Sequence, residues 1–232
     1  MARATKAAAP PKGDPRARIV DALMELAGER PWEDISMAEI AARAGVSLAD
    51  FRDAFPSKGA VLAGLSRRID RIVLDATTDD LAGEPARDRL FDVLMRRLDA
   101  MAPYKAGLEA VAGWARRDPV AALALNQMAV NSMRFMLEAA RIETEGALGL
   151  AKTQGLVLVW LRVLDVWFRD DADLSRTMAA LDRELTRGGE WARRAEKLHE
   201  LSRPLRNLFA AVFAARPEPR PPRRPDDETV DV

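Results

Sequence analysis

Apolar residues recur along this chain at the spacing of α-helices, and no stretch has the alternation of a β-strand. In the first segment, which begins near Pro15, the apolar residues Ile19, Leu23, Leu26 and Ala27 share one face of a helix. Because the same spacing continues between glycines, prolines and capping residues, we predict an all-α chain. Further helices are expected at 36–44, 47–55, 58–80, 86–101, 104–117, 119–141, 147–168 and 174–187, and 191–215 is expected to form one or two helices broken at Pro204.

The second-to-last of these helices carries a regular apolar stripe. Leu174, Met178, Leu181 and Leu185 are spaced so that they lie on one helical face. We expect this stripe and the end of the preceding helix to pair with a second copy of the chain as a four-helix bundle, the interface of a homodimer. Two consecutive glycines, at 188–189, are expected to end the helix.

Composition limits the chemistry of these helices. The 232 residues include 36 Lys and Arg against 36 Asp and Glu, and this net charge of zero argues against coating nucleic acid by bulk charge. With no cysteine and a single histidine, His199, thiolate and multi-histidine metal sites are excluded. The adjacent carboxylates Asp170 and Asp171 have no nucleophile beside them, and no glycine-rich phosphate loop is present. We expect a binding protein without catalytic residues, metal or cofactor.

No segment has the apolar length of a signal peptide or of a membrane span. The longest uninterrupted apolar run covers residues 155–161, whereas a span needs about 20 such residues. We therefore expect a cytoplasmic protein.

Residues 36–47 have the layout of a helix-turn-helix. Ser36 and Glu39 have the spacing of a capping box, Gly45 is placed to make the turn, and Ser47 is placed to cap the next helix. Small alanines at 41, 42 and 44 allow the two helices to cross closely. In such a unit the second helix can enter a DNA major groove, where side chains of its first turns face the base edges.

The segment 35–62 resembles the N-terminal domain of TetR-type transcriptional regulators. Its most specific parts are Ile-Ala-x-x-Ala-Gly-Val-Ser at 40–47 and Phe-Pro-Ser-Lys at 55–58. The resemblance implies a ligand-responsive repressor that binds double-stranded operator DNA as a homodimer and holds a small effector in a larger C-terminal domain. It also implies that phosphates are contacted by Ser36, Ser47 and Lys58, and that the exposed face of the recognition helix consists of Leu48, Ala49 and Arg52.

The expected recognition helix departs from the family in its charge. Family members usually have a basic or small polar residue at the position of Leu48 and a phosphate-contacting tyrosine at that of Arg52, although a guanidinium also binds phosphate. Asp50 and Asp53 oppose the counterion release that drives DNA binding. Residues 1–70 hold 11 Lys and Arg against 10 Asp and Glu, a net charge of +1.

These features divide the chain into four parts. We expect a flexible basic arm at 1–14, a helix-turn-helix domain at 15–70, a helical ligand-binding and dimerisation domain at 71–215, and a disordered tail at 216–232. The arm either reaches into a minor groove or is a solvated tail. The positive charges in and just after it are Arg3, Lys6, Lys12, Arg16 and Arg18, opposed only by Asp14.

The larger domain is rich in methionine and aromatic residues at helical spacing. Such side chains line adaptable apolar pockets, and they are also ordinary core residues. We expect a pocket for a small apolar effector or lipid, whose binding changes the separation of the two recognition helices. Its lining is expected to include Trp114, Met128, Phe135, Trp160 and Trp167.

A second resemblance leaves an alternative function open. Residues 159–173 and 177–183 are similar to the ubiquinone-biosynthesis accessory proteins, which have a TetR-like fold and bind isoprenoid lipid instead of DNA. This implies a lipid-binding accessory protein without DNA binding. The segment 191–215 has the apolar and basic residues of an amphipathic helix, which either makes peripheral contact with an anionic membrane or packs on its own domain.

Overall fold

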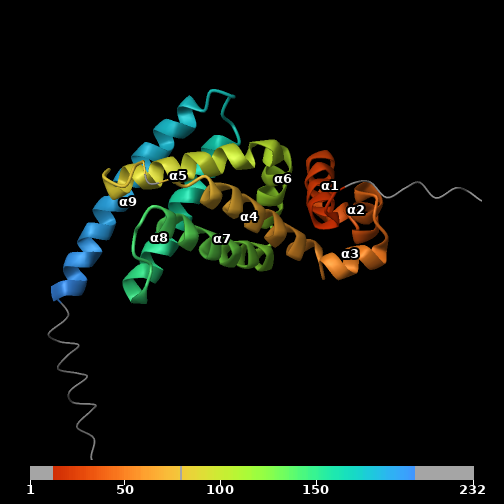
Figure 1. The fold of residues 1–232 in the computed structure, drawn as a ribbon, viewed down its shortest axis with the longest axis horizontal. Coiled ribbons are helices and arrows are strands. Elements are labelled where there is room, and N and C mark those ends of the chain that lie inside the picture. Colours follow the sequence, from red (N-terminus) through yellow and green to blue (C-terminus); the bar gives the residue numbers. More distant parts are fainter. Residues whose placement is uncertain (1–12, 79, 202–232) are drawn as a thin grey trace, which may run out of the picture. The chain divides into compact units, whose positions relative to one another are not determined.

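The computed structural model describes residues 13–78 and 80–201, with side chains as far as Glu190. The chain divides into a compact unit of residues 1–192 and a second unit of residues 193–232, and only the first is described below. The described residues form helices joined by turns, without a β-strand among them, which confirms the predicted all-α class. In order along the chain (Figure 1) they are α1 (Pro15–Glu29), η1 (Trp32–Asp34), α2 (Met37–Ala44), α3 (Leu48–Ala54), α4 (Lys58–Asp75), α5 (Ala86–Met101), η2 (Ala102–Tyr104), α6 (Lys105–Ala115), α7 (Pro119–Ala139), α8 (Gly146–Trp167) and α9 (Ser175–Leu201).

The first helices pack around one apolar cluster. Ile19 and Leu23 of α1, Ile40 of α2, Phe51 of α3 and Val61 of α4 are each at most 1% exposed. Burying a side chain of this size contributes about 1.5–3 kcal/mol. Because α2 and α3 are shorter than helices that are stable in isolation, this cluster is what holds them in place.

Helix α4 belongs both to this cluster and to the larger domain. It contacts α1, and it also contacts α5 and α7. The predicted domain boundary after residue 70 falls inside α4, which continues without a break to Asp75 and ends there, short of the expected Asp80. A displacement of α4 would therefore change the packing of both the helix-turn-helix domain and the larger domain.

The larger domain has its own buried residues on α5, α7 and α8. Leu94 and Leu98 of α5, Met133 and Met136 of α7, and Trp167 of α8 are at most 1% exposed. They belong to the same continuous core as the helix-turn-helix residues. The two domains therefore share one apolar interior.

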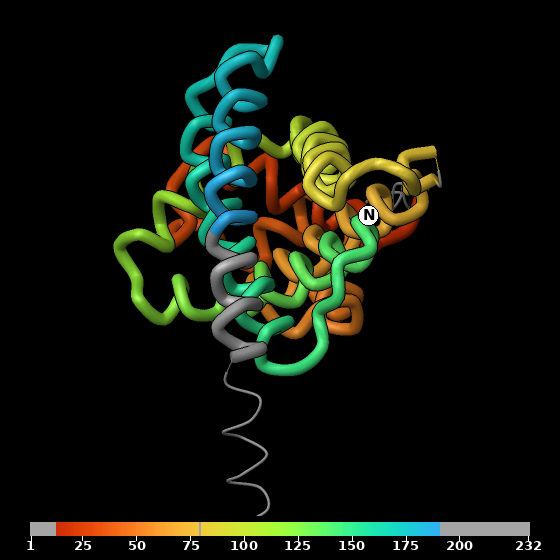
Figure 2. Tube along the Cα trace, turned by 90° about the vertical axis from the view of Figure 1, so that its left-hand side faces the viewer, coloured from red at the N-terminus to blue at the C-terminus, as the bar shows by residue number. Residues whose placement is uncertain are grey.

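Helices α8 and α9 form an antiparallel pair (Figure 2). Arg162 of α8 pairs with Glu184 of α9 at 2.9 Å, and Gly188 of α9 lies close enough to α8 that an added Cβ would be 3.6 Å from Val159. The expectation that the glycines at 188–189 end this helix is wrong, because α9 continues to Leu201. A glycine weakens a helix by about 1 kcal/mol, which is too little to end one supported by a neighbour.

Within the part of the chain that the structure describes, α8 has the length and mean hydropathy of a membrane-crossing helix. Its most apolar window is 39% buried inside the protein. Val157, Val163 and Trp167 lie in the core at 0–1% exposed. The apolar character of α8 is thus partly explained by its central position in the helical domain.

Helices α1 and α6 pack so closely that their backbones are in contact. A Cβ added at Gly107 of α6 would lie 2.5 Å from the carbonyl oxygen of Met24 in α1, and one added at Gly28 would lie 3.3 Å from the Cβ of Ala106. Real Cβ atoms essentially never come within 3.0 Å of a heavy atom of a neighbouring helix. Gly107 is therefore required for the contact between the helix-turn-helix domain and the larger domain.

We expect Gly107→Ala to lower the free energy of unfolding by about 1–3 kcal/mol, because the added methyl group must push α1 away from α6. The matched control is Gly113→Ala in the same helix, where an added Cβ meets nothing within 4 Å. That change should raise stability by about 0.5–1 kcal/mol. Urea unfolding followed by circular dichroism measures both, and equal effects of the two substitutions would contradict the close contact.

Candidate nucleic-acid interface and ligand cavity

The turn between α2 and α3 has the predicted geometry. Ser36 caps α2, because its hydroxyl accepts from the backbone N–H of Glu39 at 3.2 Å while the Glu39 carboxylate accepts from the Ser36 N–H at 2.9 Å. The Ser36 hydroxyl also donates to that carboxylate at 2.7 Å, and the hydrogen bonds from the hydroxyl and N–H of Ser36, with a further one from Arg30, lower the pKa of Glu39 to about 2. Gly45 follows α2 with φ 63° and ψ 39°, a left-handed conformation that favours glycine. The chain can thus reverse within a few residues and start α3.

Helix α3 begins with a second capping box. Ser47 accepts from the N–H of Asp50 at 3.0 Å, and the Asp50 carboxylate accepts from the Ser47 N–H at 3.1 Å and from its hydroxyl at 2.7 Å. The hydrogen bonds from Ser47 lower the pKa of Asp50. The carboxylate of Asp50, which is unusual in a DNA-reading helix, therefore caps the N-terminal end of that helix.

The predicted reading face of α3 is exposed. Leu48 is 55% exposed, and Ala49 and Arg52 also lie on the surface, as does Asp53. Phe51, on the opposite face, is 1% exposed and anchors the helix. Ser36 and Ser47 are exposed at the first turns of α2 and α3. The structure thus leaves these five predicted contact residues accessible on one domain.

Lys58 lies differently from the other predicted contacts. Its ammonium donates to the carbonyl oxygens of Trp32 at 2.8 Å and Ile35 at 2.6 Å, and it lies 4.8 Å from the centre of the Trp32 ring. Burial lowers its pKa, an effect that Glu33 opposes. In this structure Lys58 ties the start of α4 to η1, and a phosphate contact by Lys58 remains a prediction.

Two cations that were counted with the basic arm are part of α1. Arg18 donates to the carbonyl oxygens of Ala44 at 2.9 Å and Gly45 at 3.3 Å, so it satisfies the end of α2. Arg16 lies over the Phe55 ring at 4.6 Å. Residues 1–12 of the arm lie outside the described residues.

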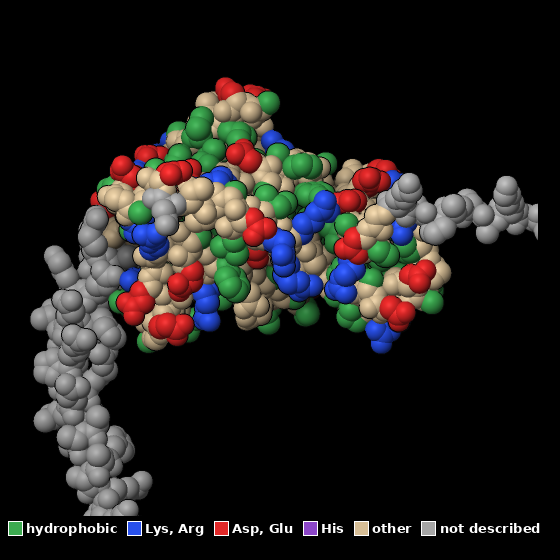
Figure 3. All heavy atoms as spheres, viewed as in Figure 1, with side chains coloured by type: hydrophobic (Ala, Val, Ile, Leu, Met, Phe, Trp, Pro, Cys, Tyr) green, Lys and Arg blue, Asp and Glu red, His purple; other side chains and the backbone are tan. Residues whose placement is uncertain are grey.

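Charges of both signs cover the helix-turn-helix domain. Figure 3 shows Lys and Arg side chains interspersed with Asp and Glu on the face in view. Arg43 of α2 is bound at 2.8 Å by Glu29 and at 3.4 Å by Glu25, both of α1. Much of the positive charge is thus neutralised inside the domain, and Arg52 is the exposed cation of α3.

The comparisons with known proteins agree with this geometry. The family model of bacterial regulatory proteins of the tetR family matches residues 19–65, which span the helix-turn-helix. A solved TetR transcriptional regulator from Nitrosomonas europaea is 26% identical, with 76% of this chain and 99% of that chain covered and a TM-score of 0.61. The chain therefore has an N-terminal helix-turn-helix domain of the TetR type.

A second solved structure is also similar to this chain. A TetR transcriptional regulator from a Rhodococcus species is 23% identical and has a TM-score of 0.53, with 75% of this chain and 95% of that chain covered, which supports the fold. No curated protein sequence matches this chain. The chain therefore has the fold and the DNA-binding domain of a TetR-family transcriptional regulator.

The larger domain contains a mainly apolar cavity of about 670 Å³, here called the α4 cavity. Residues of α4 form part of its wall, together with residues of α5, α6, α7 and α8. Of the predicted pocket residues, Met128 and Trp160 line it. Trp167 lines neither this cavity nor the groove described next, because it is buried in the core.

A second hollow, here called the interdomain groove, has a volume of about 950 Å³ and lies between η1, α2, α4, α6 and α7. Trp114 and Phe135 line it, and Met128 lines both spaces. Trp114 stacks on Trp32 with 4.9 Å between ring centres. The predicted aromatic residues are thus divided between the cavity, the groove and the core.

The predicted dimer stripe faces the chain's own core for much of its length. Leu181 is 0% exposed and Leu185 is 6% exposed, while Leu174 is half-buried with φ 56°. Met178 is 39% exposed. Within this protomer, the regular spacing of the stripe reflects burial of Leu181 and Leu185 in the core that includes α8. These two leucines are not available to a partner copy.

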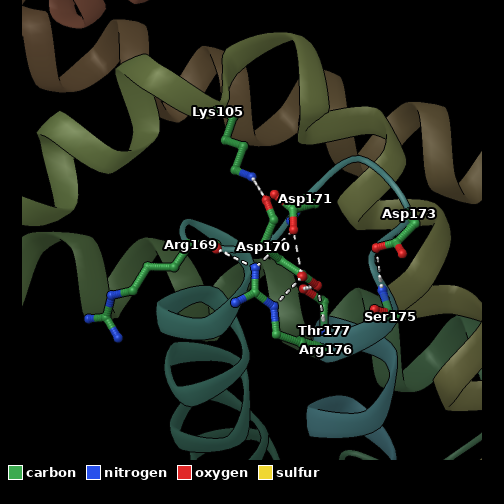
Figure 4. Close-up of polar contacts among 8 residues, drawn as sticks. All are labelled: Lys105, Arg169, Asp170, Asp171, Asp173, Ser175, Arg176 and Thr177. Atoms are coloured by element: carbon green, nitrogen blue, oxygen red, sulfur yellow. Dashed lines mark hydrogen bonds and ion pairs between the residues drawn. The ribbon is translucent and has the colours of Figure 1, made fainter.

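The acidic turn between α8 and α9 is held in place by hydrogen bonds to Asp170 (Figure 4). Asp170 accepts from the N–H of Thr177 at 2.7 Å and from the guanidinium of Arg176 at 2.8 Å, and its carbonyl oxygen accepts from Lys105 at 2.8 Å. Although burial raises the pKa of Asp170, the bonds from Thr177 and Arg176 outweigh it and hold the pKa well below its usual value. Asp170 therefore joins α9 to α6.

Sequence reasoning missed the buried ionic pair that joins α4 to α5. Arg97 of α5 forms a salt bridge with Asp70 of α4, and Arg97 is only 5% exposed. Its signal was readable, because Leu90, Val93 and Leu94 place residue 97 on the apolar face of its helix. A charge at such a position requires a buried partner.

Among the described residues there is no cluster of His, Asp and Glu that could hold a metal ion. The side chains of the segment 191–215, for which membrane contact was considered, lie outside the description, and so does the tail at 216–232.

We expect Asp50→Ala to lower the melting temperature at neutral pH, while Asp53→Ala, in the same exposed helix, leaves it nearly unchanged. Because folding lowers the pKa of Asp50, its stabilisation is complete above the pKa of the unfolded chain and is lost as the pH falls through the lower folded pKa. Thermal unfolding across the acid range measures this. A difference between wild type and Asp50→Ala that persists below both pKa values would contradict the role of the carboxylate.

Proposed function

We propose that this protein is a ligand-responsive repressor that binds operator DNA as a homodimer. The observation that carries the proposal is the double role of α4. Its first turns bury Val61 and Leu65 in the core that also contains Phe51 of α3, and Leu62, Leu65, Ser66 and Ile69 line the α4 cavity. A molecule that fills the cavity therefore contacts the same helix that packs in the core of the helix-turn-helix domain.

The response is a shift between two conformations. In the homodimer, the two α3 helices read half-sites about 34–36 Å apart. An effector in the α4 cavity stabilises the conformation in which this separation is lost, and operator affinity falls by the ratio of its affinities for the two conformations. The effector is a small and mainly apolar molecule, since the cavity wall is largely hydrocarbon.

On the DNA-binding face, Arg52 binds phosphate, and Leu48 and Ala49 lie against base edges. Ser36 and Ser47 add contacts at the N-terminal ends of α2 and α3, where backbone N–H groups and the helix dipole favour phosphate. The exposure of all five residues supports these assignments. Lys58 contributes if its ammonium leaves the carbonyl oxygens of Trp32 and Ile35.

The test of DNA binding is a gel shift with the DNA upstream of the protein's own gene and neighbouring promoters. Arg52→Ala should weaken binding to all bound sequences and reduce the slope of log affinity against log salt by about 0.9, which corresponds to one phosphate contact. Arg43→Ala removes the same charge from a guanidinium already bound by Glu29, and should change the slope less. Failure to shift any promoter fragment would refute the repressor.

The homodimer forms through the exposed apolar side chains of α8 and α9. Leu150, Leu158 and Leu161 of α8 are 53–55% exposed and lie on one helical face, and Met178 of α9 is exposed as well. Two copies of this helix pair bring four helices together. Leu174, Leu181 and Leu185 support the interface from within each protomer.

We expect Leu158→Glu to convert the dimer to a monomer of 25.6 kDa, because the carboxylate would be buried without a partner between two copies of α8. Val120→Glu on α7, where the native side chain is 78% exposed, should leave the dimer intact. Sedimentation velocity distinguishes the two masses. A dimer that is unaffected by Leu158→Glu would rule out this interface.

A further inference from the structure

The interdomain groove has walls from both domains. Trp32 of η1 and Met37 of α2 belong to the helix-turn-helix domain, whereas Trp114 of α6 and Phe135 of α7 belong to the larger domain. The groove and the α4 cavity share residues of α4 and α7, but none of these four side chains lines the cavity. A molecule bound in the groove therefore contacts both domains directly and leaves the cavity free.

The lining of the groove is mainly apolar and contains aromatic rings. Trp114 stacks on Trp32 with 4.9 Å between ring centres and an angle of 24° between the ring planes. Trp114 is half-buried and Phe135 is 53% exposed, so a ligand can reach both rings. Aromatic pairs in offset or tilted arrangements are more stable than their buried area alone predicts. The lining therefore favours a ligand with a flat aromatic body.

Each of the two long helices that border the groove carries an arginine without a partner. Arg67 of α4 and Arg134 of α7 line the groove and are exposed. In the part of the chain whose side chains are described, neither forms a hydrogen bond or an ion pair. By contrast, Arg68, the neighbour of Arg67, is paired with Asp21 at 2.7 Å. Helices α4 and α7 are in contact and lie side by side (Figure 1), so both free guanidinium groups border the same groove.

The charges in the lining favour an anion over a cation. The third cation of the lining is Lys58, whose ammonium already donates to two carbonyl oxygens. Among the lining residues that the structure describes, the one carboxylate is Asp70, which is neutralised by Arg97 and accepts from the hydroxyl of Ser132 at 2.6 Å. A ligand carboxylate would thus meet unpaired guanidinium groups, the donors that bind carboxylates most strongly.

We propose that the interdomain groove binds a flat aromatic carboxylate, whose ring lies against Trp114 and Phe135 and whose anionic group is bound by Arg67 and Arg134. The groove volume of about 950 Å³ is sufficient for a small organic molecule. This site is additional to the effector cavity of the proposed function, and binding in it requires neither DNA nor an occupant of the α4 cavity.

A ligand in the groove acts on the position of one domain against the other. It contacts Trp32 and Met37 on the helix-turn-helix side, whereas a ligand in the α4 cavity reaches that domain only through residues of α4. It therefore stabilises the arrangement of the two domains that contacts it best. Operator affinity then changes by the ratio of the ligand's affinities for the DNA-bound and the free protein, a step that rests on the proposed function.

Three probes with the same ring system test the proposal on the full-length protein: 2-naphthoate, methyl 2-naphthoate and 2-naphthylmethylammonium. They are an anion, a neutral ester and a cation. We expect isothermal titration calorimetry to give an affinity for 2-naphthoate about tenfold above that for the ammonium, and this preference should decrease as salt is added. No binding of 2-naphthoate, or equal binding of the ammonium, would overturn the proposal.

Arg67→Gln and Arg134→Gln should each lower the affinity for 2-naphthoate about threefold, and together about tenfold, because each removes one partly exposed ionic contact. The affinity for methyl 2-naphthoate should not change. The matched control is Arg71→Gln, which removes an exposed charge one turn further along α4 at a residue outside the lining. It should leave the affinity nearly unchanged. Equal losses in the Arg71 and Arg67 variants would contradict a specific site.

Phe135→Leu keeps an apolar side chain but removes the ring, and should lower the affinity for 2-naphthoate about threefold. Leu123→Ala, on the same helix at a residue that is 71% exposed and outside the lining, should have no effect. Leu108→Ala changes the α4 cavity alone and should also have no effect. A loss of affinity in Leu108→Ala with none in Phe135→Leu would place the anion in the cavity and refute the proposal.

A gel shift with and without 2-naphthoate separates this inference from the proposed function. If the protein shifts a promoter fragment but does not bind 2-naphthoate, the inference fails and the DNA-binding function stands. If 2-naphthoate binds through Arg67 and Arg134 while no promoter fragment is shifted, the site is upheld and the repressor function fails. If it binds there and leaves an existing shift unchanged, the site is upheld and its effect on DNA binding is refuted.

Discussion

The close contact of α1 with α6 is the constraint on which the rest of the structure depends. Gly107 has no side chain, so the backbone of α6 reaches the carbonyl oxygen of Met24 in α1. Beside it, Tyr104 donates to Asp21 of α1 at 3.1 Å, and Asp21 also accepts from Arg68 of α4 at 2.7 Å. The helix-turn-helix domain is thereby attached to the larger domain through contacts of α1 with α6 and with α4. Its orientation therefore depends on how that domain packs.

Helix α4 connects the core of the helix-turn-helix domain to the α4 cavity. Val61 and Leu65 of α4 lie in the core, residues 62–69 of the same helix line the α4 cavity, and Asp70 is held by the buried Arg97 of α5. Removing one partner of such a buried pair typically costs about 3–5 kcal/mol, so the pair specifies where α4 lies. Cavity, ion pair and recognition helix are consequently parts of one unit.

Several charges around the reading head have partners within the fold. Lys58 donates to two carbonyl oxygens, Arg18 satisfies the end of α2, and Asp50 closes the capping box of α3. A sequence pattern gives the charge of a side chain but not its partner, because that partner lies up to 27 residues away along the chain. The net charge of the domain therefore says little about how much charge remains for DNA.

The sequence alone determined what depends on neighbouring residues: the helical periodicity, the capping box at Ser36, the cap at Ser47, the turn at Gly45, and the family motif. Only the tertiary structure decided which faces are covered, because burial depends on helices that are distant in sequence. Leu181 and Leu185 therefore turned out to be core residues, and the predicted aromatic pocket was divided between cavity, groove and core. The arginines of the interdomain groove that lack a partner in the described part of the chain emerged in the same way, since a side chain's partners are fixed only when the helices have packed.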